Sequence, residues 1–386
     1  MTVSGPCNPG VVDVVTLGES MVTFLPSRPG RLADVPSFDR AIGGAESNVA
    51  CTLAAAGHSV RWVSRVGADG FGDHLVEAIG AYGVDVTAVR RDPARPTGIY
   101  FRTAGDRSTA AHEVAYYRTG SAASAMSVAN TDLSAVRAGR VLHLSGITAA
   151  LSEGCLGLMR ELTASRAGRP LISFDVNHRP GLWSGADGAG VLLELARDAD
   201  VVFVGEDEAE EAWGVTGGPV AIRAALPEPA VLVVKQGGRG ATVFAQPAGG
   251  RPAQPAGNRA AGAAPDPRKG GTPQARAGEP RPTPALTPGT FVPALAVDVV
   301  ATIGAGDAFA AGFLSATLRN LPMKTRLRHG HLTAAATLTA QGDLAPPPTR
   351  AHADRLAALD DEAWGRLRLG PGWTQAGRPP EEVRTP

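Results

Sequence analysis

The sequence is poor in lysine, cysteine and aromatic residues, and it carries no net charge. Lysine provides 3 of the 37 basic residues, cysteine 3 of the 386 residues, and aromatic side chains 5% of the chain. The 37 basic residues balance 37 acidic ones, so the chain lacks the basic field that drives non-specific nucleic-acid binding. Cys7, Cys51 and Cys155 lie far apart without a CxxC pair, which excludes a recognisable zinc module or disulfide framework.

Long apolar runs are also missing. No stretch of 18 residues is free of charges and helix breakers, and residues 1–10 lack the basic start and apolar run of a secretory signal. We therefore expect no membrane partner and a cytoplasmic location, which the odd number of cysteines also suits. Because arginine replaces lysine almost throughout, a single arginine is weak evidence for a site, and a lysine is stronger evidence.

Short β-branched segments alternate with Ala- and Leu-rich segments of helical spacing. The buried strands that we expect are residues 11–18, 60–67, 140–146, 171–176, 200–205 and 230–238. Alternating strands and helices form βαβ units, so the sequence predicts an α/β fold with a mainly parallel sheet covered on both faces. Two extended runs within 98–119, which hold three of the four tyrosines, predict a small separate sheet.

The segment from about 245 to 290 differs in composition from the rest. It holds 10 Pro, 8 Gly and 11 Ala in 46 residues, and no Val, Ile, Phe, Tyr, Trp or Met. Such a segment cannot bury enough apolar surface to offset its ordering entropy, so we expect a disordered insert. Around it we expect one domain over 11–370, with irregular tails at 1–10 and 371–386.

The clearest signal for chemistry is ATIGAGDAFAAGF at 301–313. Gly304, Ala305 and Gly306 precede Asp307 at the start of an apolar helix. Small residues there let backbone N–H groups approach an anion, and the helix dipole adds about half a positive charge. A carboxylate at this position can accept the proton of an attacking hydroxyl during phosphoryl transfer. These four residues are candidate catalytic groups, with Asp307 as a plain N-cap as the equal alternative.

GAGDAFAAGF at 304–313 resembles the C-terminal signature of the ribokinase-like (PfkB) carbohydrate kinases. GGAESNVACTLAAAG at 43–57 and VGADGFGDHL at 66–75 resemble the N-terminal signature, and the resemblance covers about 11–245 and 291–348. It implies a doubly wound, ribokinase-like α/β domain with a small β-sheet lid at about 97–120. It also implies ATP and Mg²⁺ as cofactors, and a homo-oligomer, of a size the sequence does not give, that assembles through the lid.

Within that family the chain is most similar to 2-keto-3-deoxygluconate kinases, through TGIYF at 97–101, AYYRTGSAAS at 115–124 and DVNHRPGLW at 175–183. The resemblance implies ATP-dependent phosphorylation of this sugar acid to 2-keto-3-deoxy-6-phosphogluconate. The implied substrate-binding residues are Gly43, Gly44, Asn48, Tyr100, Tyr116, Arg118 and Arg179. Guanidinium groups suit a substrate carboxylate because their planar fork binds it through two hydrogen bonds. The alternatives are surface ion pairs for the arginines and lid packing for the tyrosines.

The same resemblance implies positions for the nucleotide and the metal. The implied nucleotide-binding residues are Lys235, Gly237, Gly240 and His331, with a core histidine as the alternative for the last. Glu208 is the implied magnesium-linked residue, although Gly205 replaces the asparagine usual in that motif. Ala301 stands where the family often has an aspartate linked to a monovalent cation, so we doubt a strong potassium site.

Two alternative functions remain open from the sequence. The first is a fructokinase, ribokinase or other neutral-sugar kinase of the same family, for which the lid arginine is the discriminating feature. The second is a sugar-acid-binding regulatory protein that has lost turnover, which the departures at Ala301 and Gly205 suggest. The intact GAGD loop argues against the second alternative.

Overall fold

The computed structural model describes residues 10–28, 30–103, 113–183, 188–246 and 288–375. Most of the insert expected at 245–290 and of the tails expected at 1–10 and 371–386 therefore lies outside the described residues. None of the described helices is long and apolar enough to cross a bilayer.

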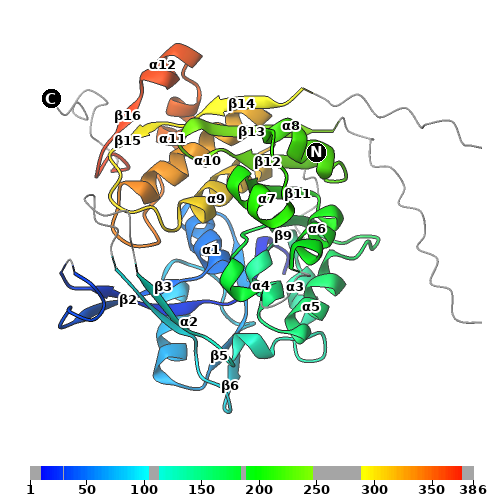
Figure 1. Ribbon diagram of the computed structural model, residues 1–386, viewed down its shortest axis with the longest axis vertical. Coiled ribbons are helices and arrows are strands. Elements are labelled where there is room, and N and C mark those ends of the chain that lie inside the picture. Colours follow the sequence, from blue (N-terminus) through cyan, green and yellow to red (C-terminus); the bar gives the residue numbers. More distant parts are fainter. Residues whose placement is uncertain (1–9, 29, 104–112, 184–187, 247–287, 376–386) are drawn as a thin grey trace, which may run out of the picture.

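An eight-stranded sheet runs through the centre of the molecule (Figure 1). Its strands in spatial order are β14 (Thr290–Pro293), β13 (Gly240–Ala245), β12 (Val231–Lys235), β11 (Val201–Gly205), β10 (Leu171–Asp175), β9 (Gly139–Ser145), β1 (Val12–Leu17) and β4 (Val60–Val63). All pairs from β4 to β12 are parallel, and only β13 and β14 pair antiparallel. The expected mainly parallel α/β fold is thus confirmed. The chain order reverses beside β1, and ligands of open α/β sheets bind at the carboxyl ends of strands near such a reversal.

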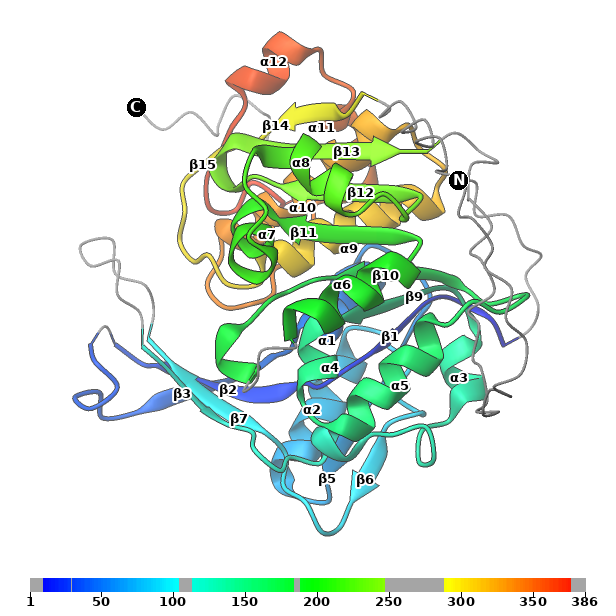
Figure 2. The ribbon, with the colours of Figure 1, turned by 45° about the vertical axis from the view of Figure 1, so that its right-hand side comes forward.

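Helices cover both faces of this sheet (Figure 2). One face packs against α1 (Ala45–Ala55), α9 (Ala305–Leu318) and α10 (Met323–Leu338), and the other against α5 (Glu153–Thr163), α6 (Gly188–Asp198) and α8 (Gly218–Ala225). The remaining helices are α2 (Gly70–Ala81), α3 (Leu133–Arg137), α4 (Gly146–Ala150), α7 (Glu206–Trp213), α11 (Arg350–Ala357) and α12 (Asp361–Arg366). Two-stranded pairs form from β5 (Arg65–Gly67) with β6 (Arg90–Asp92) and from β15 (Ala296–Val297) with β16 (Arg368–Leu369).

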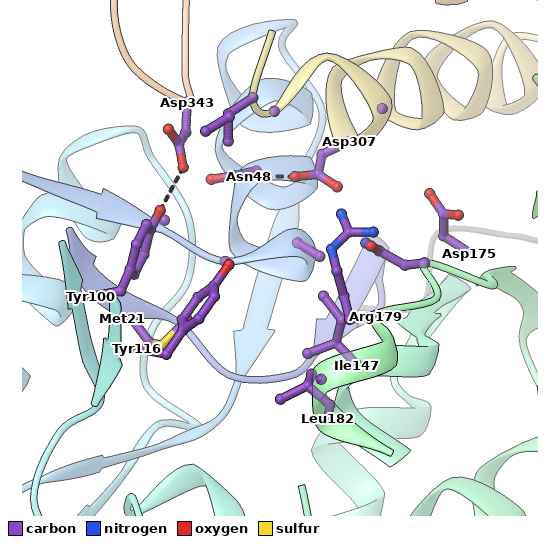
Figure 3. Close-up of a pocket in the computed structure, with 18 of the residues that line it drawn as sticks. Met21, Asn48, Tyr100, Tyr116, Ile147, Asp175, Arg179, Leu182, Asp307 and Asp343 are labelled. Atoms are coloured by element: carbon purple, nitrogen blue, oxygen red, sulfur yellow. Dashed lines mark hydrogen bonds between the residues drawn. The ribbon is translucent and has the colours of Figure 1, made fainter. Parts of the chain in front are cut away.

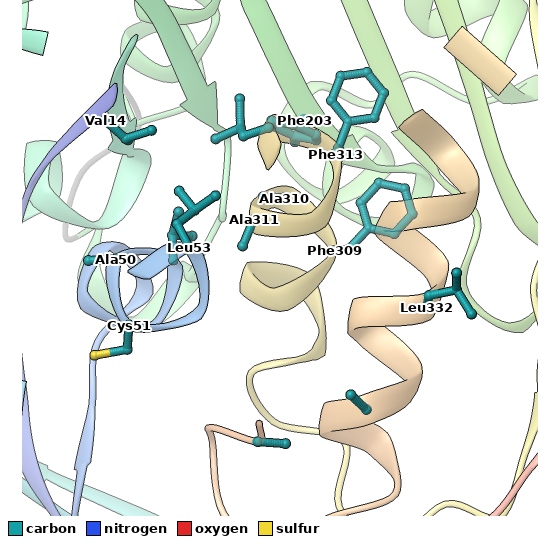
Figure 4. Packing of buried hydrophobic residues seen from close by; sticks show 14 of the residues in the cluster. Val14, Ala50, Cys51, Leu53, Phe203, Phe309, Ala310, Ala311, Phe313 and Leu332 are labelled. Carbon is teal, nitrogen blue, oxygen red and sulfur yellow. The ribbon is translucent and has the colours of Figure 1, made fainter. Parts of the chain in front are cut away.

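The core places α9 against the sheet and against α1. Val14 and Phe203 of the sheet belong to the same buried cluster as Phe313 of α9 (Figure 4). Leu53 of α1 points toward Ala311 of α9, and both side chains are fully or almost fully buried between these neighbouring helices (Figure 4). Close packing of α9 fixes the position of its first turn at the carboxyl edge of the sheet.

A second sheet of four strands projects from the main body (Figure 2). Its order is β3 (Phe38–Gly43), β2 (Met21–Pro26), β7 (Ile99–Arg102) and β8 (Val114–Tyr117). The small sheet expected within 98–119 is confirmed as the β7–β8 half of this lid. Sequence reasoning did not separate β2 and β3, because neither is a long run of β-branched residues.

Candidate active site

A pocket of about 620 Å³ opens between the lid and the carboxyl ends of the central strands (Figure 3). Most of the residues singled out from the sequence contribute to its wall. These are Gly43, Gly44, Asn48, Tyr100, Tyr116, Arg118, Arg179, Glu208, Lys235, Gly304, Gly306 and Asp307. Segments far apart in the sequence thus converge on one cavity, which has the size typical of a small-molecule site.

Asp307 lies in the first turn of α9 and faces the pocket (Figure 3). The N-cap of this helix is Gly304. The alternative interpretation of Asp307 as a plain N-cap is therefore wrong. Asn48 Nδ2 donates a hydrogen bond of 2.8 Å to Asp307 Oδ2. Burial raises the pKa of Asp307 to about 7. The hydrogen bond from Asn48 lowers it, and the negative charge of Asp175 raises it further. A carboxyl group with this pKa can exchange a proton near neutral pH.

The anion-binding turn before Asp307 depends on a left-handed glycine. Gly304 has a φ of +80°, and a Cβ there would lie 2.2 Å from the carbonyl oxygen of Asp343. No side chain caps the first turn of α9, and Gly306 beside it is exposed. The first N–H groups of an α-helix have no partner within the helix, so this turn offers donors and the positive end of a dipole to an anion.

Asp175 is a pocket residue that the sequence analysis did not single out. It ends β10, and its carboxylate oxygens lie 3.0 and 3.2 Å from Lys235 Nζ at the end of β12. Burial disfavours the charged ammonium, but the charges of Asp175 and Glu208 outweigh it and raise the pKa of Lys235. A polar residue directly after a buried strand, as in LISFD, is the signal that would have found it.

Glu208 faces the pocket from the first turn of α7. Its Oε2 accepts a hydrogen bond of 2.6 Å from the backbone N–H of Gly205, and it lies 3.8 Å from Lys235 Nζ. Among the described residues, no group of three or more His, Cys, Asp or Glu is arranged to hold a metal ion. Mg²⁺ commonly keeps several waters and binds through one or two carboxylates plus substrate phosphates. The residues therefore fit an ion that arrives with a nucleotide, and they do not form a metal cage of their own.

The two predicted arginines differ in how far they are already paired. Arg118 Nη2 forms a buried ion pair with Glu19, and Ser121 Oγ donates to the second carboxylate oxygen at 2.5 Å. Glu19 was not singled out from the sequence, and it neutralises the guanidinium expected to bind substrate. Arg179 is 52% exposed, donates to the carbonyl of His178 at 2.8 Å and lies 3.8 Å from Glu208 Oε1.

The predicted lid tyrosines stand side by side over the pocket (Figure 3). Tyr100 and Tyr116 are paired in register on β7 and β8, with ring centroids 5.4 Å apart. The hydroxyl of Tyr100 donates to Asp343 at 2.7 Å, and this tyrosine is buried, whereas Tyr116 is 53% exposed. Tyr116 is therefore the freer of the two hydroxyl groups.

Three predicted nucleotide residues and one predicted catalytic residue do not line this pocket. Ala305 is the first residue of α9, Gly237 lies in the turn between β12 and β13, and Gly240 begins β13. His331 is buried in the core, where its ring lies 5.2 Å from that of Phe309 and its Nε2 is 3.2 Å from the carbonyl of Val292. Burial lowers the pKa of His331 to about 4, which leaves it neutral. This placement fits the core alternative for His331, and the nucleotide contact stays a prediction.

Comparison with known proteins identifies similar proteins over most of the chain. Residues 12–258 and 287–350 match the pfkB family of carbohydrate kinases. The 2-dehydro-3-deoxygluconokinase of Bacillus subtilis (strain 168) is 32% identical over 358 residues, which are 90% of this chain and 95% of that protein. The probable chloroplastic fructokinase-6 of Arabidopsis thaliana is 28% identical over 355 residues, 87% of this chain and 80% of that protein.

A solved structure confirms the fold. The crystal structure of a PfkB protein from Polaromonas sp. JS666 superposes with a TM-score of 0.70 at 30% identity, covering 89% of this chain and 99% of that one. The resemblance seen in the two sequence signatures is thereby confirmed, and so is the ribokinase-like fold. The chain belongs to the pfkB family and is a carbohydrate kinase, a phosphotransferase that acts on a sugar hydroxyl.

Proposed function

We propose that the protein transfers the γ-phosphoryl group of ATP to 2-keto-3-deoxygluconate and forms 2-keto-3-deoxy-6-phosphogluconate. The observation that carries this proposal is the pairing of two features in one pocket. Asp307 and the uncapped start of α9 lie on one wall, and a tyrosine and two arginines lie on the others. The similarity to a 2-dehydro-3-deoxygluconokinase over 90% of the chain supports the same substrate.

Asp307 is the proposed general base. With a pKa of about 7 it is largely ionised at slightly alkaline pH, and it can take the proton of the attacking sugar hydroxyl. Asn48 holds the carboxylate through Oδ2, which leaves Oδ1 for the substrate. Mg²⁺ bound with ATP would neutralise phosphate charge, and Glu208 and Asp175 would hold it. The N–H groups that begin α9 would stabilise the charge on the transferring group.

The substrate carboxylate is proposed to bind chiefly to Arg179. This guanidinium is half-exposed at the pocket wall and its nearest described carboxylate, Glu208, is 3.8 Å away. Arg118 shares its charge with Glu19, so it contributes less net attraction than its position alone suggests. Tyr116 contributes a ring face and a free hydroxyl to the lining of the same pocket.

The test is ADP release measured with a panel of sugar acids and neutral sugars. We expect turnover with 2-keto-3-deoxygluconate and its galactonate epimer, and weak turnover with fructose and ribose. Binding of the sugar acid without ADP release would favour the regulatory protein that lacks turnover. A preference for a neutral sugar would overturn the proposed substrate while leaving the kinase assignment intact.

A neutral-sugar kinase is the second candidate, and one observation favours it. Because Glu19 neutralises Arg118, the lid end of the pocket carries less positive charge than the number of arginines indicates. The similarity to a probable fructokinase-6 over 87% of the chain points the same way. Substitution of Arg179 by alanine discriminates between the two candidates, since only a sugar acid needs its charge.

We also propose that two copies pair through the outer faces of their lids. That face carries Phe24 and Phe101, stacked with centroids 4.8 Å apart, beside Tyr117, which is 64% exposed. Light scattering after chromatography should give the mass of a dimer, and Tyr117→Lys should give a monomer. A monomer in the unaltered protein would contradict the pairing.

The proposed location is the cytoplasm. Cys51 and Cys155 are both free and buried, which suits a reducing compartment. Fractionation of cells that express the chain should place it with cytosolic proteins, and recovery from a secreted fraction would contradict this.

A further inference from the structure

Asp343 is a buried carboxylate at the back of the pocket, in the loop that follows α10. It accepts hydrogen bonds from two side chains of lid strand β7: from Tyr100 on Oδ2 at 2.7 Å and from Arg102 on Oδ1 (Figure 3 shows the first). The Arg102 and Asp343 side chains are 4% and 3% exposed. The lid therefore reaches the main body of the protein through a buried ion pair.

The same residue also contacts the anion-binding turn. A Cβ on Gly304 would lie only 2.2 Å from the carbonyl oxygen of Asp343, so only a glycine fits at this position. The end of lid strand β3 closes in from another side: a Cβ on Gly43 would lie 2.1 Å from the Tyr100 hydroxyl and 2.7 Å from Asp343 Oδ2. Asp343 thus stands where lid strands β3 and β7 meet the start of α9.

A buried ion pair is poor evidence for a role in stability alone. Desolvation of two charges roughly offsets their attraction, and apolar residues of similar size often stabilise a protein as well or better. What such a pair provides is a defined geometry, because removal of one partner leaves an uncompensated charge. Arg102 and Tyr100 alternate with outward-facing residues on β7, so both bonds fix the same face of this strand.

We propose that Asp343 is a positioning residue that couples the lid to the anion-binding turn. It holds β7 through Tyr100 and Arg102, and its own backbone packs against Gly304. A sugar under the lid is thereby held at a fixed position relative to the start of α9. The inference rests on the kinase reaction and on a sugar bound beneath the lid, and it does not depend on which sugar is preferred. When the lid is no longer held at this position, water gains access to the phosphoryl group.

The test compares Asp343→Asn with a matched control, Asp200→Asn. Asp200 forms a comparably buried ion pair with Arg169, but it precedes β11 and so lies at the opposite edge of the sheet from the pocket. We measure the KM for sugar, the KM for ATP, ADP release without sugar, and the melting temperature, using whichever sugar the unaltered protein turns over best.

Asp343→Asn should raise the sugar KM by about tenfold and raise the ratio of sugar-free to sugar-dependent ADP release, with the KM for ATP nearly unchanged. Asp200→Asn should lower the melting temperature and change neither quantity. If both variants only lose stability, the positioning role is wrong. If no sugar supports turnover, the kinase reaction itself fails, which is a distinguishable outcome.

A second set of variants keeps the test decisive if Asp343→Asn does not fold. Arg102→Lys retains the positive charge and loses the planar fork, so it should fold and show a smaller change in the sugar KM in the same direction. If Asp343→Asn does fold, a double-mutant cycle of Asp343→Asn with Arg102→Gln should show strongly non-additive effects on the sugar KM. Additive effects, or a normal sugar KM in Arg102→Lys, would overturn the proposal.

Discussion

At the scale of single residues, the chemistry centres on Asp307. Its carboxylate is oriented by Asn48 and lies in the first turn of α9, beside helix N–H groups that no side chain caps. We expect Asp307→Asn to lower kcat by about 10²–10⁴-fold, the range usual for loss of a general base. Calorimetry should still detect sugar binding, because the amide keeps the shape of the carboxylate. Near-normal turnover in this variant would sink the assignment.

The pKa of about 7 for Asp307 predicts a pH dependence with a definite sign. Below this pH the carboxyl group is protonated and cannot accept the hydroxyl proton. The value of kcat/KM for sugar should therefore fall about tenfold per pH unit on the acid side and level off above pH 7. If the acid side of the pH–rate profile instead inflects near pH 3.8, the ordinary pKa of an aspartate, burial does not raise the pKa of Asp307.

Single residues were predictable from the sequence where their motif is local. Asp307 and Asn48 stand inside two signatures, and both face the pocket. Glu19 and Asp343 were missed because their partners are remote: Tyr100 and Asp343 are 243 positions apart, and Arg118 and Glu19 are 99 apart. No spacing rule connects such pairs before the fold is known.

At the scale of elements, the start of α9 is the most constrained feature. Gly304→Ala would place a Cβ against the carbonyl of Asp343 in a backbone conformation that favours glycine. We expect it to lower kcat by at least about tenfold and to lower the melting temperature, since both strain and displacement act on the anion-binding turn. The assay is initial rate together with thermal unfolding.

Gly157→Ala provides the control for that variant. Gly157 lies in α5 on the surface, and a Cβ there meets nothing within 4 Å. Alanine should stabilise this helix by about 0.5–1 kcal/mol and leave turnover unchanged. A similar loss of activity in both variants would mean that the turn before Asp307 has no special role.

Elements were predictable to the extent that their pattern is local. The β-branched runs VVFVG and VLVVK form β11 and β12 as expected, because strands buried on both faces are apolar throughout. The lid was only half recognised, since β2 and β3 lack such a run. β2 is held between β7 and β3, and β3 pairs only with β2. His331 shows the reverse case, because its place near a nucleotide motif did not reveal that Phe309 and Val292 enclose it.

At the scale of the whole molecule, we expect residues 247–287 to be dispensable for catalysis. Val243 of β13 and Thr290 of β14 are paired in register, so a short turn can join these strands in place of residues 247–287. A protein with that replacement should keep its kcat, its sugar KM and its melting temperature within error. A clear loss in any of the three would assign the insert a role in the kinase.

The net charge of zero has a consequence for recognition at this scale. No overall field attracts an anionic substrate, so selection of a sugar acid must depend on the few charges that line the pocket. Two of the buried arginines near the lid, Arg102 and Arg118, are paired with carboxylates of the chain itself. The account therefore assigns discrimination between acid and neutral sugars mainly to Arg179.

The most direct test is a competition assay between 2-keto-3-deoxygluconate and fructose, which gives the ratio of their kcat/KM values. The account predicts a ratio above about 10 for the unaltered protein, equivalent to about 1.4 kcal/mol, and a ratio near one for Arg179→Ala. A ratio below one in the unaltered protein would contradict the account and identify a neutral-sugar kinase.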